Sequence, residues 1–115
     1  MILEEFLKNL KRGKFMIPYC ISCSSATWPP SDHCYLCASK TKLRRIEHIT
    51  GKLVEFTASK DMGSRRIFGV VDIEGVKLIG SIKSLLPYVG MNLNIDACGV
   101  LSDGTPFYEF KDSEE

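Results

Sequence analysis

Four of the five cysteines in this chain form two Cys-x-x-Cys pairs, and they are the residues best suited to chemistry. The pairs are Cys20 with Cys23 and Cys34 with Cys37, with a loop of ten residues between them. Each pair forms a turn called a knuckle, in which two thiolates converge on one metal ion. Two knuckles together complete a closed tetrahedral site with no position left for chemistry. The spacing therefore predicts a zinc ribbon, in which Zn²⁺ has a structural role.

Iron is the main alternative to zinc, because rubredoxins bind it with the same four thiolates. Rubredoxin knuckles usually carry glycine after the second cysteine, where it lets backbone amides turn toward the sulfurs. Ser24 and Ala38 stand at these two positions here. The absence of glycine weakens the iron interpretation and favours zinc.

The alternatives to a metal site, a disulfide framework or a redox dithiol, both need a context that this chain does not offer. Residues 1–12 mix apolar with charged side chains, which is not typical of a secretory signal, and no apolar run is long enough to cross a membrane. A disulfide framework or a redox dithiol is therefore disfavoured. We expect a cytoplasmic protein with reduced cysteines and no membrane segment.

The composition fits one compact unit or a small metal module fused to a small barrel, with 115 residues, 44% hydrophobic and 25% charged. The formal net charge of +1 hides an uneven distribution. Residues 38–66 hold eight lysines and arginines against three acids, whereas the residues from 67 onward hold three lysines against eight acids. The basic stretch is either an anion-binding surface or an ordinary solvated strand face.

The first residues predict an amphipathic helix within residues 1–14. Apolar residues recur at helical spacing from Ile2 to Leu10, two acids lie in the first turn, and Lys11 and Arg12 lie in the last turn, before Gly13. The apolar stripe either packs on its own domain or docks on another protein, and the sequence favours neither.

The sequence after the ribbon has the alternation typical of strands. Glu74 and Gly75 predict a two-residue hairpin turn, and residues 84–88 predict a short helical or turn connector. The expected strands are residues 43–49 and 52–59, read as one bent strand or two, then 67–73, 76–82, 92–101 and 106–110. This order fits a five-stranded Greek-key barrel of the OB type. We predict a mainly β chain with an N-terminal helix (1–14), a rubredoxin-like zinc ribbon (15–42) and a C-terminal five-stranded OB-fold barrel (43–115).

The order of motifs along nearly the whole chain is specific enough to suggest a family. The landmarks are Phe6 to Gly13, Cys20-x-x-Cys23, Pro29-Pro30, Cys34-x-x-Cys37, Thr50-Gly51, Phe56-Thr57, Gly69 to Gly75, Gly80, Gly90-Met91, Asp103-Gly104 and Tyr108-Glu109-Phe110. They resemble the short acyl-CoA-associated proteins that pair a rubredoxin-like zinc ribbon with an OB-fold, a domain of unknown function. Ser24 and Leu53 depart from the family pattern, because glycine is usual at both positions.

The resemblance implies a non-catalytic partner of thiolase-type enzymes. Archaeal relatives look like bridges between acetoacetyl-CoA thiolase and hydroxymethylglutaryl-CoA synthase. The implied function is a scaffold or accessory subunit that binds acyl-CoA and aids its passage, without being an enzyme itself. The implied partners are a thiolase-family enzyme, hydroxymethylglutaryl-CoA synthase and acyl-CoA.

Coenzyme A would require cationic donors for its phosphates and an apolar groove for its pantetheine arm. The available donors are Lys42, Arg44, Arg45, Arg65 and Arg66. Arginine suits phosphate because its planar fork donates two parallel hydrogen bonds, although arginine pairs on strands are commonly plain surface.

Trp28 lies in the loop between the knuckles, followed by two prolines. Its ring either stacks on adenine or contacts a partner, or it packs over the ribbon as a hydrophobic lid. Packing is the favoured interpretation, because so small a ribbon has few other apolar side chains to cover it.

Single-stranded nucleic-acid binding is the alternative function, because zinc ribbons and OB-folds both support it. Phe56, Phe68 and Tyr108 would supply stacking platforms beside the arginines. The near-neutral net charge and the acidic second half argue against this function. An enzyme is the weakest hypothesis, since no nucleophile with a companion base is recognisable.

Three further residues have side chains capable of chemistry. We expect His33 not to bind the metal, because four cysteines already fill the shell. His48 is interpreted as a strand residue. Nothing beside Cys98 in the sequence activates its thiol, and it lies opposite the apolar face of its strand.

Overall fold

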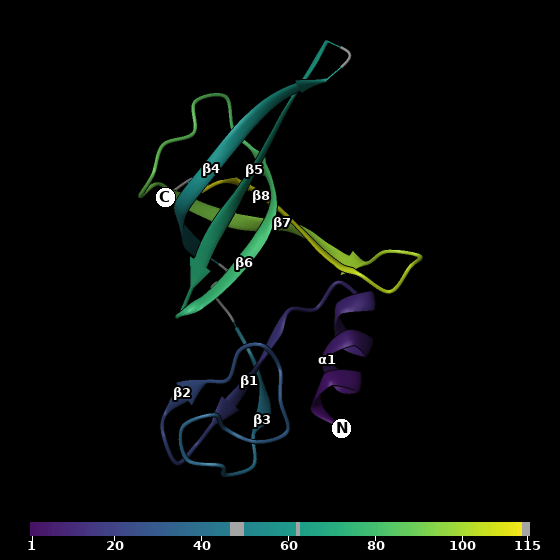
Figure 1. The fold of residues 1–115 in the computed structure, drawn as a ribbon, viewed down its shortest axis with the longest axis vertical. Helices are drawn as coiled ribbons and strands as arrows, with labels where there is room; N and C mark the ends of the chain where they lie inside the picture. Colours follow the sequence, from purple (N-terminus) through teal and green to yellow (C-terminus); the bar gives the residue numbers. More distant parts are fainter. Residues whose placement is uncertain (47–49, 62, 114–115) are drawn as a thin grey trace. The chain divides into compact units, whose positions relative to one another are not determined.

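The computed structural model describes residues 1–46, 50–61 and 63–113 of the chain, which divides into two compact units (Figure 1). One unit comprises Met1–Glu47 with Cys98–Pro106, and the other comprises His48–Ala97 with Phe107–Glu115. We call them the ribbon unit and the barrel unit. No helix in the described ranges is both long and apolar enough to span a membrane.

The ribbon unit begins with the predicted helix, α1 (Ile2–Lys11), followed by a three-stranded antiparallel sheet. The sheet has the order β2-β1-β3 and consists of β1 (Met16–Cys20), β2 (Ser25–Ala26) and β3 (Lys42–Arg45). Phe6 and Leu10, two residues of the apolar stripe, are buried, and Phe6 makes an edge contact with Phe15 at 6.4 Å between ring centroids. Part of the stripe therefore packs within the unit, while Leu3 is 47% exposed.

An acid from the loop between the knuckles is hydrogen bonded to the start of α1. Met1, at the N-cap, makes no side-chain capping hydrogen bond, but the backbone N–H of Ile2 donates to Oδ1 of Asp32 at 2.6 Å. A carboxylate is favourable at a helix N-terminus because the free N–H groups carry partial positive charge. Asp32 thus ties the helix to the ribbon.

The barrel unit is the predicted closed barrel of five strands, in the order β4-β5-β6-β8-β7. The strands are β4 (Thr50–Asp61), β5 (Ser64–Ile73), β6 (Val76–Lys83), β7 (Asn92–Val100) and β8 (Pro106–Asp112), and the last residues of β7 and the first of β8 are grouped with the ribbon unit. The pairs β4–β5, β4–β7 and β5–β6 are antiparallel, and β6 and β8 are parallel. The order matches an OB-type barrel. Fully buried side chains fill it, including Leu53, Val71, Ile73, Val76, Leu78, Leu93 and Phe110.

Two features of the barrel depend on glycines that stand at these positions in the sequence. The β5–β6 hairpin turns at Glu74 and Gly75, whose φ angles of 51° and 87° are both positive, as a two-residue turn of type I′ requires. At Gly51, a Cβ atom would lie 2.6 Å from the carbonyl oxygen of Asp72, so only glycine lets β4 approach β5 this closely.

Several element boundaries differ from the prediction. The stretch 43–49 was expected to lead into the barrel, but β3 pairs with β1, with Arg45 opposite Met16, and so extends the ribbon sheet. Residues 47–49, including the expected strand residue His48, lie outside the described ranges. The connector 84–88 forms bends without a helical turn, and Leu101 lies beyond the end of β7. The domain limits 15–42 and 43–115 stay a prediction.

The β4–β5 hairpin is longer than expected. Its strands reach Asp61 and start at Ser64, whereas the alternation of apolar residues predicted ends at residues 59 and 67. Because the last pair between β5 and β6 is Phe68 with Ser81, the hairpin continues as two strands alone (Figure 1). We call residues 58–61 and 64–67 the arm.

Candidate functional site

The four paired cysteines lie together in the ribbon unit, as predicted. Their sulfurs all lie within 4.8 Å of one another, with Cys20 Sγ 3.5 Å from Cys37 Sγ and Cys23 Sγ 3.9 Å from Cys34 Sγ. A tetrahedron with Zn–S bonds of about 2.3 Å has edges of about 3.8 Å, so the sulfurs are spaced to hold Zn²⁺. Four thiolates leave no position for water or substrate, and the centre is structural.

Backbone amides support this sulfur cluster in both knuckles. The N–H of Cys23 donates to Cys20 Sγ, and the N–H of Leu36 donates to Cys34 Sγ, each at 3.4 Å. Such bonds offset part of the negative charge that four thiolates retain around a divalent ion.

The residues after the second cysteines adopt the conformation that usually requires glycine. Ser24 has φ 52° and Ala38 has φ 62°, both in the left-handed region. The knuckle turns therefore form without glycine, at a cost of about 1 to 2 kcal/mol for each residue. The missing glycines are thus no argument against iron by themselves.

The four thiols of the metal-free cluster do not ionise alike. A hydrogen bond from the Ser39 side chain lowers the pKa of Cys37 to about 6, whereas the hydrogen bond with the Cys37 sulfur raises the pKa of Cys23 to about 12. Since zinc binds thiolates, loading the cluster must release protons, and acid must compete with the metal.

The remaining histidine and cysteine of the described ranges do not extend the metal centre. His33 is exposed and is not among the four clustered ligands. Cys98 is half-buried, and burial raises the pKa of its thiol, which disfavours a reactive thiolate.

Trp28 contributes to the packing of the ribbon unit. Its ring makes edge contacts with Phe6 at 5.4 Å and with Phe15 at 6.4 Å between centroids. This is the hydrophobic lid that the composition favoured, and the ring is half-buried. A contact of Trp28 with adenine or a partner stays a prediction.

The five candidate phosphate donors are divided between the two units. Lys42, Arg44 and Arg45 belong to β3 of the ribbon sheet, and Arg65 and Arg66 belong to β5. Arg44 places its guanidinium carbon 4.4 Å from the centre of the Tyr19 ring, a cation–π contact that holds this side chain on the sheet.

The arm carries a cation that the sequence did not single out as a site residue. Lys60 pairs directly with Arg65, and Arg66 pairs with Ser59 on the opposite face. Like charges directly opposite on a hairpin are unfavourable. No ion pair of Lys60, Arg65 or Arg66 occurs within residues 1–46, 50–61 and 63–113. An anion bound between Lys60 and Arg65 would relieve the repulsion. The sequence could have indicated this pair only if the position of the hairpin turn at Gly63 had been known, because the turn determines that Lys60 lies opposite Arg65.

A hollow of about 400 Å³ lies beside the arm. It is lined by Arg65, Ile67, Ile82, Lys83, Ser84, Leu85 and Asp112. Arg65 Nη1 donates to the carbonyl oxygen of Leu85 at 3.4 Å, which orients the guanidinium at the hollow. Lys83 forms an ion pair with Asp96 at 3.0 Å, and their hydrogen bond raises the pKa of Lys83 and lowers that of Asp96.

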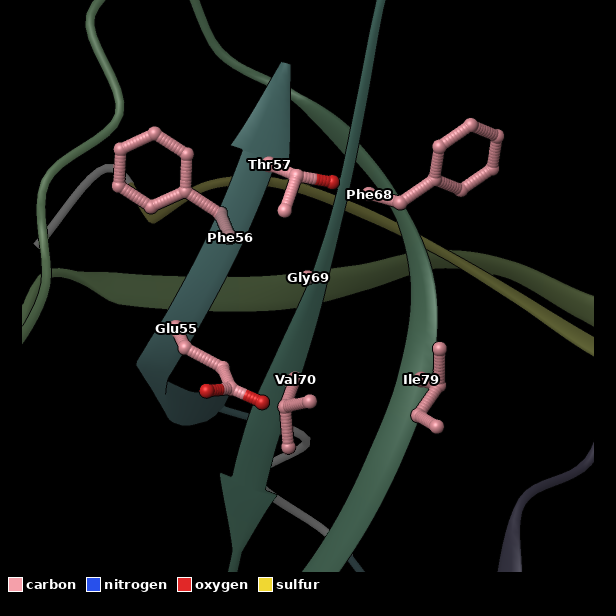
Figure 2. Close-up of a pocket in the computed structure, with 7 residues that line it drawn as sticks. All are labelled: Glu55, Phe56, Thr57, Phe68, Gly69, Val70 and Ile79. Carbon is pink, nitrogen blue, oxygen red and sulfur yellow. The ribbon is translucent and has the colours of Figure 1, made fainter. Parts of the chain in front are cut away.

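A second hollow, of about 280 Å³, lies over β4, β5 and β6 (Figure 2). Phe56 and Phe68 point away from one another on either side of Gly69, and Glu55 is the only ionisable residue that lines the hollow. A carboxylate without a cation does not suit phosphate. Tyr108 is 8% exposed, so it cannot act as the stacking platform expected for nucleic acid.

Comparison with known proteins agrees with this architecture. Residues 8–43 match the family model of the ChsH2 rubredoxin-like zinc ribbon domain. The fold is similar to a chain of the Ltp2-ChsH2(DUF35) aldolase, with a TM-score of 0.74 and 16% identity over 96% of this chain and 94% of that one. It is also similar to a protein with unknown function from the DUF35 family of Sulfolobus solfataricus, with a TM-score of 0.70 and 15% identity over 96% of this chain and 84% of that one. No curated protein matches the sequence. The predicted family resemblance is confirmed.

Proposed function

We propose that this chain, whose residues 8–43 match the ChsH2 rubredoxin-like zinc ribbon model, is a non-catalytic scaffold that binds acyl-CoA and bridges thiolase-type enzymes. Acetoacetyl-CoA thiolase and hydroxymethylglutaryl-CoA synthase are the proposed enzymes. The observation that carries the proposal is the combination of a closed four-sulfur centre with a barrel that bears a cationic arm. The centre supplies structure without chemistry, and the barrel supplies binding surface.

Two features support a role beside an enzyme. The fold is similar to a chain of the Ltp2-ChsH2(DUF35) aldolase, a protein named for two components. In the described part of this chain, the paired cysteines are the only group of three or more potential metal ligands, and their site is closed. We assign catalysis to the partner rather than to this chain, as the resemblance to non-catalytic partners of thiolase-type enzymes implies.

The arm is the proposed contact for the phosphates of CoA. Lys60 and Arg65 lie opposite one another, and Arg65 also lines the hollow of about 400 Å³. Ile67 and Ile82 give that hollow an apolar floor, which suits the pantetheine arm. Lys42, Arg44, Arg45 and Arg66 stay secondary candidates. The second hollow is not part of this proposal, because Glu55 lines it without a cation.

The bridging role is tested by affinity purification of the tagged protein from its native source, followed by reconstitution with the recovered enzymes. We expect a thiolase or a synthase to be retained, and a complex of both with this chain to sediment as one species. Immobilised protein that retains neither enzyme nor acyl-CoA would contradict the proposal. Binding of single-stranded DNA that weakens steeply with salt would favour the nucleic-acid alternative instead.

The CoA contact is tested by Arg65→Glu, with calorimetric titration of acetyl-CoA into the chain saturated with its enzyme partner. A charge-assisted hydrogen bond contributes about 1.5 to 3 kcal/mol, so the Kd should rise by roughly 10- to 100-fold. Lys77→Glu is the matched control, because it makes the same charge change at an exposed position of β6 outside both hollows. Equal losses in both variants would show that net charge, and not the arm, governs binding.

A further inference from the structure

The four cysteines of the metal centre differ in how far solvent reaches them. Cys20 and Cys34 are buried, at 0% and 5% exposure, and Cys23 is half-buried. Cys37 is exposed, and it is the only one of the four ligands that is. A small reagent dissolved in water therefore reaches this ligand of the centre before it reaches the other three.

The second knuckle leaves this ligand uncovered on the surface of the ribbon unit. Tyr35 and Leu36, the two residues before Cys37, are 63% and 80% exposed. Ala38, the residue after it, is also exposed. The exposure of Cys37 is therefore a property of the whole turn, because its sequence neighbours extend into solvent and do not fold over the sulfur.

A second sulfur lies close to that of Cys37. The distance from Cys37 Sγ to Cys20 Sγ is 3.5 Å, shorter than the 3.9 Å between Cys23 Sγ and Cys34 Sγ. Redox-sensitive cysteines combine an accessible thiolate with a neighbouring cysteine that resolves its oxidised form. The exposed Cys37 and the adjacent, buried Cys20 meet both conditions.

We propose that Cys37 is an oxidation site for hydroperoxides, and that Cys20 resolves the oxidised sulfur as a disulfide. The inference goes beyond the proposed function, because it concerns the metal centre alone and needs no partner enzyme. A cysteine that coordinates Zn²⁺ is deprotonated at neutral pH, and the thiolate is the nucleophilic form of the side chain. Exposure and deprotonation thus coincide at Cys37.

With hydrogen peroxide as the oxidant, the modification takes two steps at sulfur. In the first step, the Cys37 thiolate attacks one peroxide oxygen. The S–O bond forms, the O–O bond breaks and hydroxide leaves, so that sulfur is oxidised to sulfenic acid and the peroxide is reduced. In the second step, the Cys20 thiolate attacks Cys37 Sγ, the S–S bond forms, and the S–O bond breaks with loss of a second hydroxide.

The modification removes the metal from the ribbon unit. Two of the four thiolates are consumed in the disulfide, and structural zinc sites require four ligands. Loss of zinc takes with it the folding free energy that the metal supplies. A thiol reductant reverses the disulfide and restores the four ligands, so the ribbon unit can be reassembled when zinc is present.

Cys98 is the competing site of oxidation. It is half-buried, and burial raises the pKa of its thiol, so that it stays protonated at neutral pH and reacts slowly. It is also not one of the four clustered ligands, so its oxidation removes no metal ligand. Release of zinc therefore distinguishes modification at Cys37 from modification at Cys98.

The zinc-loaded full chain, treated with hydrogen peroxide, tests the site directly. Dimedone added with the peroxide traps sulfenic acid, and peptide mass spectrometry locates the adduct. We expect the first adduct at Cys37. Without dimedone, we expect a disulfide between Cys20 and Cys37 and release of zinc to a chromogenic chelator. A first adduct at another cysteine, or zinc that is retained throughout the oxidation, would overturn the proposal.

A ligand exchange tests the same site by rate. Cys37→His replaces the exposed thiolate by imidazole, and sites of three cysteines and one histidine also bind zinc. Zinc release by peroxide should slow by about 10-fold or more in this variant. Cys23→His is the matched control, because it makes the same exchange at a half-buried ligand and keeps Cys37, and its rate should stay within about twofold of the wild type.

The two variants decide whether exposure selects the reacting ligand. Equal slowing in both would show that peroxide reaches any sulfur of the cluster, which contradicts the assignment to Cys37. If Cys37→His binds no zinc, the position of the first dimedone adduct in the wild-type chain decides the question.

Discussion

The ribbon unit and the barrel unit are stabilised by different means. Fully buried apolar side chains from five strands fill the barrel, among them Leu93 and Phe110 at 0% exposure. The described part of the ribbon unit has a smaller apolar core, with Phe6, Leu10, Phe15 and Ile17 buried beside a sheet of three short strands. A module of this size depends on its metal as well as on its core, while the barrel can rely on hydrophobic burial.

Loss of a zinc ligand should have the largest effect, because we expect it to unfold the ribbon unit and to leave the barrel unit folded. We expect Cys20→Ser or Cys37→Ser to abolish zinc retention and unfold the ribbon unit, because apparent zinc-binding free energies of roughly 10 to 16 kcal/mol become folding free energy in such modules. Trp28, the only tryptophan, contacts Phe6 and Phe15, so its fluorescence reports on this unit.

Amide hydrogen exchange on the same variants reports on the barrel. Strands β5 and β6, which lie wholly in the barrel unit, should keep their protection when zinc is removed by mutation or by a chelator. Ser22→Ala, a change inside the first knuckle that leaves all four sulfurs in place, is the control and should bind zinc normally. If the barrel amides lose protection together with the metal, the units do not fold independently and the contrast is wrong.

The opposite perturbation is a cavity in the barrel. Phe110 is completely buried, and Phe110→Ala should destabilise the barrel unit by about 3 to 5 kcal/mol through lost burial and the cavity left behind. Urea denaturation followed by the exchange of β6 amides measures this loss. Zinc content and the Trp28 signal of the folded variant should equal those of the wild type. Zinc loss at urea concentrations that leave the wild-type ribbon intact would mean that the barrel core supports the metal centre.

The two regions also differ in how far the sequence alone predicted them. Cys-x-x-Cys spacing is local, and it correctly placed all four sulfurs. The turn at Glu74 and Gly75 is equally local, because glycine permits the positive φ of such a turn. Pairing between distant strands leaves a weaker signal: residues 43–45 look extended in either sheet, and only the observed register assigns them to β1. The same holds for Lys60, which became a candidate once its register opposite Arg65 was known.

The connector between β6 and β7 shows a different limit of sequence-based prediction. Residues 85–89 have the composition of a core segment, and nothing local distinguishes a buried apolar connector from an exposed one. The sequence predicted a short helical or turn segment here, but the exposure of its apolar side chains was evident only from the fold. Exposed apolar surfaces are therefore hidden from pattern analysis, whereas metal ligands are not.

The smallest predicted effect concerns the strained turns of the ribbon. Ala38 has φ 62°, and Ala38→Gly should stabilise the zinc-bound ribbon unit by about 1 kcal/mol, because the cost of the left-handed conformation exceeds the extra chain entropy of glycine. Competition with a chromogenic zinc chelator measures the gain as a lower rate of metal loss. The matched control is Ala26→Gly in β2, where φ is not positive and glycine should be neutral or destabilising. Because the barrel holds no part of the cluster, neither change should alter its amide exchange. Equal behaviour of the two variants would show that the left-handed turn at Ala38 stores no strain.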